Sequence, residues 1–155
     1  MTSVQDTPPG DPAALGLLLC RDVLKGSTAV SVTFPGSAAF VPSARRFVRG
    51  ILTSCPRAED LELIASEMMS NAIRHTPSGQ PGGTFTLTVR TRAGWARVEV
   101  SGPGSGEWEH DRDSGCPDDE DGRGLAIINA LADTFGHHGD ANGQTVWAQA
   151  EWPED

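Results

Sequence analysis

The sequence lacks the features of a secreted or membrane-spanning protein. It has no charged start followed by a short apolar segment, and no apolar run approaching the roughly 18 residues of a transmembrane helix. Its three cysteines, Cys20, Cys55 and Cys116, are odd in number and do not have the spacing of a metal site. We therefore expect reduced thiols and a cytoplasmic location, with no membrane partner.

Basic residues are also scarce. The chain has 12 Lys and Arg against 21 Asp and Glu, which gives a net charge of −9. An acidic total without a basic patch argues against direct binding of nucleic acid. Acidic residues crowd between positions 107 and 121, where Arg112 is the one Lys or Arg. Such a run is either a solvated loop, a docking surface for a basic segment of a partner, or an autoinhibitory lid.

The pattern of apolar residues predicts one α+β domain. We expect a partly disordered N-terminal extension over residues 1–27, with a short helix between Ala13 and Leu24, and a domain over residues 28–155. The expected strands cover residues 28–34, 84–92, 95–101, 134–138 and 144–152, and the expected helices cover residues 41–54, 60–76 and 125–133. This order predicts a two-layer sandwich, in which a mixed, mainly antiparallel sheet carries its helices on one face.

The helix over residues 60–76 combines an apolar face with a polar stripe. Its apolar residues fall on one side at about 100° per residue, which suits packing on a sheet. Glu67 and Asn71 lie one turn apart on the second stripe, together with Arg74. A carboxylate beside a carboxamide is either a solvated pair or a base next to a metal-binding or hydrogen-bonding ligand.

Two glycine-rich segments follow that helix. Gly102, Gly104 and Gly106 come after an expected strand, and Gly122-Arg123-Gly124 precedes the expected helix over residues 125–133. Glycines before a helix N-terminus leave backbone N–H groups free to hold phosphate oxygens, and the helix dipole favours an anion there. Taken singly, such glycines are also typical of simple turns.

In combination, these motifs resemble the GHKL, or Bergerat-fold, ATP-binding domain of the histidine-kinase-like ATPases. Within that family the chain looks like the bacterial anti-sigma-factor serine kinases. The stretch Glu67-x-x-x-Asn71-Ala72-x-x-His75 is similar to the family's N box. The stretch Gly122-Arg123-Gly124-Leu125 is similar to its second glycine box, and the resemblance covers nearly the whole chain, from about Thr28 to Trp152.

The resemblance implies a role for each of these residues. It implies that Asn71 coordinates Mg²⁺, that Glu67 is the general base for an incoming serine hydroxyl, and that residues 103–123 form a lid over ATP. Arg74 is expected either to pair with phosphate or to structure the site. The remaining residues expected to bind ATP are those of the two glycine boxes, namely Gly102, Gly104, Gly106, Gly122, Arg123, Gly124 and Leu125.

One position departs from the family pattern. The family's first glycine box has an aspartate that accepts a hydrogen bond from the adenine amino group, and this chain has Gly102 there. Such a charge-assisted bond is worth about 1.5–3 kcal/mol, so its loss weakens binding roughly ten- to a hundredfold. The hydroxyl of Ser101 or a water molecule is a candidate substitute.

Two functions therefore remain open. In the first, the protein is an ATP-binding serine/threonine kinase that binds a sigma factor and phosphorylates an antagonist, an anti-anti-sigma-type protein. In the second, it is a catalytically inactive, nucleotide-poor module that sequesters a regulatory protein. The presence of Glu67 and Asn71 favours the first function, and Gly102 favours the second. The family resemblance also suggests a homodimer.

Overall fold

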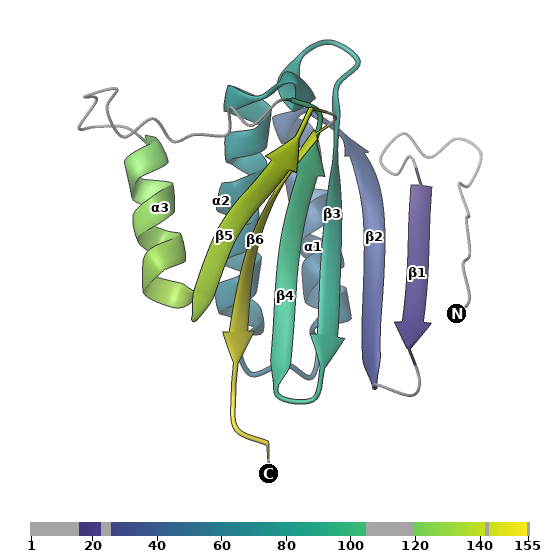
Figure 1. Ribbon diagram of the computed structural model, residues 1–155, viewed down its shortest axis with the longest axis vertical. Helices are drawn as coiled ribbons and strands as arrows, with labels where there is room; N and C mark the ends of the chain where they lie inside the picture. Colours follow the sequence, from purple (N-terminus) through teal and green to yellow (C-terminus); the bar gives the residue numbers. More distant parts are fainter. Residues whose placement is uncertain (1–15, 23–25, 105–119, 142, 155) are drawn as a thin grey trace.

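A computed structural model describes residues 16–22, 26–104, 120–141 and 143–154. Its centre is a six-stranded sheet in the order β1-β2-β3-β4-β6-β5, and each neighbouring pair is antiparallel (Figure 1). The strands are β1 (Gly16–Asp22), β2 (Ser27–Pro35), β3 (Thr84–Arg92), β4 (Trp95–Gly102), β5 (Thr134–Asp140) and β6 (Gly143–Glu151). The predicted α+β sandwich is confirmed, and its described sheet is antiparallel throughout rather than mixed.

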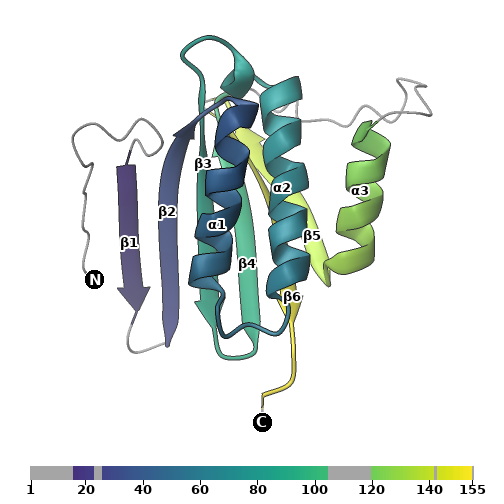
Figure 2. The ribbon, with the colours of Figure 1, turned by 180° about the vertical axis from the view of Figure 1, so that it is seen from behind.

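The helices lie on one face of this sheet, as expected. Helices α1 (Val41–Ile51) and α2 (Ala58–His75) run side by side over β3, β4 and β6, and α3 (Glu120–Leu131) lies beside α2 on the side away from α1 (Figure 2). Two short 3-10 turns, η1 (Ala38–Phe40) and η2 (Pro77–Gly79), precede α1 and follow α2. The opposite face of the sheet carries no helix within the described ranges (Figure 1).

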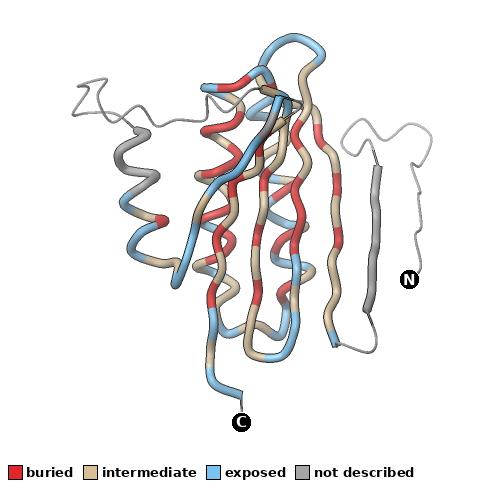
Figure 3. Tube along the Cα trace, in the orientation of Figure 1, coloured by how far each residue is buried: buried red, intermediate tan, exposed pale blue. Residues whose placement is uncertain are grey.

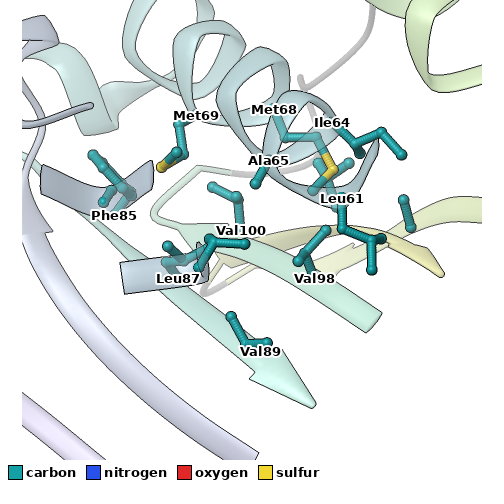
Figure 4. Close-up of a cluster of buried hydrophobic side chains, with 14 of the residues drawn as sticks. Leu61, Ile64, Ala65, Met68, Met69, Phe85, Leu87, Val89, Val98 and Val100 are labelled. Carbon is teal, nitrogen blue, oxygen red and sulfur yellow. The ribbon is translucent and has the colours of Figure 1, made fainter. Parts of the chain in front are cut away.

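The core lies between α1 and α2 and the sheet. Burial alternates along β2, β4 and β6, because successive strand residues point to opposite faces (Figure 3). The apolar face predicted for α2 packs on this buried strand face (Figure 4). The residues in contact there include Leu61, Ile64, Ala65, Met68 and Met69 of α2 and Phe85, Leu87, Val89, Val98 and Val100 of the strands. Because the apolar face of α2 is buried in this core, the polar stripe lies on another side of the helix.

The prediction of a helix between Ala13 and Leu24 is wrong. Residues Gly16–Asp22 form β1, which pairs with β2 from Gly16 opposite Thr33 to Asp22 opposite Ser27. A short apolar run fits a strand as well as a helix, and the neighbouring strand edge decides between them. The proposed boundary at residue 27 therefore falls inside a β-hairpin. The disorder expected at the start of the extension concerns residues outside the described ranges.

The last helix also begins earlier than expected. α3 starts at Glu120 rather than near Leu125, so Gly122, Arg123 and Gly124 belong to the first turns of the helix instead of preceding it. The first four N–H groups of a helix have no intrahelical acceptor wherever the helix begins. Backbone donors therefore remain available at Gly122 and Arg123, although the glycines do not form a separate loop before the helix.

Arg57 joins three elements at the end of the sandwich where α2 begins. Its guanidinium donates hydrogen bonds to Asp60 (3.0 Å) and Asp133 (3.2 Å) and to the carbonyl oxygens of Leu131 (2.6 Å) and Glu151 (3.2 Å). The hydrogen bond to Asp60 is the main reason that the pKa of Arg57 is raised. Through these bonds Arg57 holds the C-terminal end of α3 against α2 and β6.

Candidate functional site

The predicted site residues of α2 and β4 lie toward the opposite end of the sandwich from Arg57. The C-terminal half of α2, the turn η2, the end of β4 and the start of β6 meet there (Figure 1). They enclose a small cavity of about 10 Å³. Its walls are formed by Ala72, Thr76, Ser78, Val100, Ser101, Gly102, Gln144 and Val146. A cavity of this size holds about one water molecule or one polar group of a ligand.

The polar stripe of α2 is present as predicted. Asn71 is buried, with 6% of its surface exposed, while Glu67 is half-buried and Arg74 is exposed. The Nη2 atom of Arg74 donates a hydrogen bond to Oδ1 of Asn71 at 3.1 Å. The structure therefore brings Asn71 and Arg74 together, with a positive charge at the carbonyl oxygen of the expected metal ligand.

The strand β4 brings Gly102 to the cavity and leads to Gly104. Gly104 has a φ of 126°, a backbone conformation that only glycine adopts easily. A Cβ atom at Gly104 would also lie 2.8 Å from Nε2 of Gln144, so the backbone passes close to that side chain. Gly106 lies outside the described ranges. Residues 122–125 belong to the backbone of α3, and their side chains lie outside the described part of the structure.

Ser78 and Gln144 belong to this site, although sequence reasoning did not single them out. Thr76 caps η2: its Oγ1 donates to the carbonyl of Ala72 (2.6 Å) and accepts from the N–H of Ser78 (3.1 Å). The segment 76–79 was interpreted only as a helix stop, and nothing in that pattern indicates where the Ser78 hydroxyl points. Gln144 enters the site because it lies opposite Gly102 in the β4–β6 register.

The Ser78 side chain occupies the space that a side chain at position 102 would need. A Cβ atom added at Gly102 would collide with Oγ of Ser78. The space of a side chain at position 102 is therefore filled by the Ser78 hydroxyl. Ser101 does not supply a substitute here, because its hydroxyl is hydrogen-bonded to Thr145 (2.9 Å) on the face of the sheet without helices.

These residues suit a nucleotide with a divalent cation. Among the described residues, no cluster of three or more His, Cys, Asp or Glu could hold a metal by itself. A cation at Asn71 would therefore need oxygens of a bound ligand, in addition to Oδ1, to complete its coordination shell. Arg74 would provide a positive charge for phosphates beside Asn71, and the buried Ser78 hydroxyl would provide a hydrogen bond at the uncharged end.

A larger hollow of about 650 Å³ lies beside the connection between α1 and α2. That connection is at the other end of the sandwich (Figure 1). The hollow is lined by residues between Arg49 and Asp60. Burial there raises the pKa of the Cys55 thiol. None of the predicted site residues lines this hollow, so its size does not make it the functional site.

The comparison with known families concerns the domain as a whole. The family model of the histidine kinase-like ATPase domain matches residues 34–150, which reach from the end of β2 into β6. No curated protein matches the sequence. The described part of the chain contains no helix that is both long and apolar enough to cross a bilayer. The match covers most of the chain, which therefore belongs to the histidine kinase-like ATPase family and is an ATP-binding domain of the GHKL type.

Proposed function

We propose that this ATP-binding domain is a regulatory serine/threonine kinase of the anti-sigma-factor type. It would bind a sigma factor and transfer a phosphoryl group from ATP to a hydroxyl of an anti-anti-sigma-type antagonist. The observation that supports this proposal is the arrangement on α2: half-buried Glu67 and buried Asn71 lie one turn apart, and Asn71 contacts Arg74. A base, a metal ligand and a cation are the groups that phosphoryl transfer needs.

Each residue has a separate task in this proposal. Asn71 holds Mg²⁺ through its carbonyl oxygen, and Glu67 accepts the proton of the attacking hydroxyl. ATP would be the phosphoryl donor, and Mg²⁺ held by Asn71 would neutralise part of the negative charge on the transferred phosphoryl group. Arg74 contacts phosphate oxygens and leaves Oδ1 of Asn71, because a guanidinium and a cation cannot share that oxygen without strong repulsion.

A second candidate is a regulatory binding module without catalysis. It is favoured by Gly102, which removes the carboxylate expected at the base of the nucleotide, and by the Ser78 hydroxyl that fills the place of a side chain there. In this case the fold sequesters a sigma factor or a related regulator and binds nucleotide weakly. The two candidates differ in phosphate transfer rather than in fold.

Labelled phosphate transfer separates these candidates. The protein would be incubated with γ-labelled Mg-ATP and a candidate anti-anti-sigma domain, and label on the acceptor would be measured. The kinase proposal predicts transfer that Glu67→Gln reduces at least about a hundredfold while nucleotide binding is retained. Binding of ATP without transfer to any candidate acceptor, or transfer that is insensitive to Glu67→Gln, would favour the non-catalytic module.

A further inference from the structure

The Ser78 hydroxyl is a buried polar group without a hydrogen-bond partner among the described residues. Ser78 has no exposed surface, and its Oγ atom faces the small cavity beside Gly102. Leaving a buried hydroxyl unpaired costs about 1–3 kcal/mol, so a native site usually provides a partner for it. The cavity has room for one such partner, which is either a water molecule or one polar atom of a ligand.

Ser78 is held firmly in place. Its backbone lies so close to Gly36 and Gly83 that a Cβ atom at either glycine would collide with the Ser78 carbonyl. The N–H of Gly36 also donates to the carbonyl of Gly83 at 2.9 Å, which joins the two glycines around the turn. The hydroxyl therefore belongs to a rigid turn, and a ligand must come to it rather than the reverse.

The polar side chains of the cavity wall can both donate and accept hydrogen bonds. The wall contains no carboxylate, and a hydroxyl such as that of Ser78 both donates and accepts hydrogen bonds. The side-chain amide of Gln144 likewise carries both a donor and an acceptor group. A carboxylate would accept only, and would therefore select a ligand group that donates. This cavity has no such preference.

We propose that Ser78 contacts the base edge of the nucleotide, directly or through one water, and that the site accepts both 6-aminopurine and 6-oxopurine nucleotides. This rests on the nucleotide site of the proposed function. Arg74 and Asn71 receive the phosphates, which leaves the small uncharged cavity, with its apolar Ala72 and Val100, for one polar atom at the edge of the purine. The adenine amino group donates and the guanine 6-oxo group accepts, and the Ser78 hydroxyl pairs with either one by rotating.

Calorimetric titration of the full chain with Mg-ATP, Mg-GTP and Mg-CTP tests this proposal without a variant. We expect dissociation constants for ATP and GTP within about tenfold of each other, with CTP bound more weakly. ATP bound more than about a hundredfold tighter than GTP would overturn the proposal, because sites that depend on a fixed acceptor reject a ligand lacking the donor by at least that much. Equal binding of all three nucleotides would also overturn it, because the base would then not be read.

Two variants test whether Ser78 contributes to nucleotide affinity. Ser78→Ala should weaken ATP and GTP alike, by about five- to tenfold. Ser31→Ala is the matched control, because it removes a hydroxyl that pairs with Thr88 (2.8 Å) on the other face of the sheet, away from the cavity, and nucleotide affinity should not change. Unchanged affinity in Ser78→Ala, or equal losses in both variants, would overturn the role of Ser78. If no triphosphate binds, including Mg-tripolyphosphate, the nucleotide site itself fails; if tripolyphosphate alone binds, only the reading of the base fails.

Discussion

The guanidinium of Arg74 donates a hydrogen bond to Oδ1 of Asn71 at 3.1 Å, so a positive charge lies on the oxygen expected to bind a metal. In the absence of ligand, this contact satisfies a carbonyl of a buried residue. In the proposed function, phosphates and a cation at this site would release the guanidinium to pair with phosphate oxygens. The proposal therefore places Arg74 in the nucleotide site as a phosphate contact.

Replacing Arg74 should affect binding more than folding. We expect Arg74→Gln to weaken Mg-ATP binding about five- to tenfold at low salt, with a smaller loss at high salt, because exposed charges are screened. The free energy of unfolding should change by less than about 1 kcal/mol, as is usual for an exposed charged group. Calorimetry and urea denaturation measure the two effects. Arg46→Gln, which removes an exposed arginine from α1, is the control and should leave affinity intact.

Enlarging Gly102 should destabilise the fold through Ser78. Gly102→Ala puts a Cβ atom into the Ser78 hydroxyl, so we expect a loss of about 1–3 kcal/mol in the free energy of unfolding. Ser78→Gly in the same chain should recover most of that loss, because it removes the colliding atom. As a control, Gly50→Ala in α1 meets open space and should stabilise the protein by about 0.5–1 kcal/mol. A Gly102→Ala variant as stable as the parent, measured by urea denaturation, would contradict this packing.

The Gly102→Asp substitution tests the selectivity of the site between ATP and GTP. By itself, the new carboxylate must displace the Ser78 hydroxyl. Combined with Ser78→Gly, it has space at the cavity and supplies a group that only accepts hydrogen bonds. We expect the double variant to prefer ATP over GTP roughly ten- to a hundredfold more than the parent does, in parallel titrations. An unchanged ratio would show that position 102 does not contact the base.

The secondary structure was largely predictable because burial imposes a simple period on it. The apolar face of α2 and the alternation in β3, β4 and β6 are visible in the sequence, and the structure confirms these elements. β1 was not predictable, since its short apolar run becomes a strand only through pairing with β2. The start of α3 at Glu120 was missed for a similar local reason: glycines look like a turn until a helix passes through them.

The polar stripe of the candidate site was predictable because it lies on one helix. Glu67, Asn71 and Arg74 follow from helical spacing, whereas Ser78 and Gln144 come from separate parts of the chain. Ser78 reaches Gly102 only when η2 folds back over the end of β4, and Gln144 only through the register of β6. Contacts of this kind depend on tertiary packing and leave no local pattern in the sequence.

Arg57 should be important for stability. Its bonds to Leu131, Glu151, Asp60 and Asp133 join α2, α3 and β6, so Arg57→Ala should lower the free energy of unfolding by about 2–3 kcal/mol. Arg57→Lys should recover less than half of this loss, because an ammonium cannot reproduce the fork of the guanidinium. Arg90→Ala breaks a half-exposed pair with Glu99 and should cost less than about 1 kcal/mol. Equal effects of Arg57→Ala and Arg90→Ala in urea denaturation would contradict the joining role of Arg57.

Cys55 should make stability depend on pH in the alkaline range. Burial raises the pKa of its thiol in the folded state, so the folded protein holds that proton more tightly than the unfolded chain. The resulting stabilisation is complete below the unfolded thiol pKa, near 8.5, and is lost as the pH rises through the folded pKa. The difference in unfolding free energy between the parent and Cys55→Ala should therefore fall as the pH rises above about 8.5. A difference that stays constant across this range would contradict the raised pKa.

The most direct test of the nucleotide site is calorimetric titration of the full chain and of Asn71→Ala with Mg-ATP. Our account predicts saturable binding of one nucleotide per chain, and at least about a tenfold loss of affinity in Asn71→Ala. The loss should shrink when EDTA replaces Mg²⁺, because Asn71 acts through the metal. Absence of saturable heat at millimolar Mg-ATP, or equal affinity of the parent and Asn71→Ala, would contradict the account.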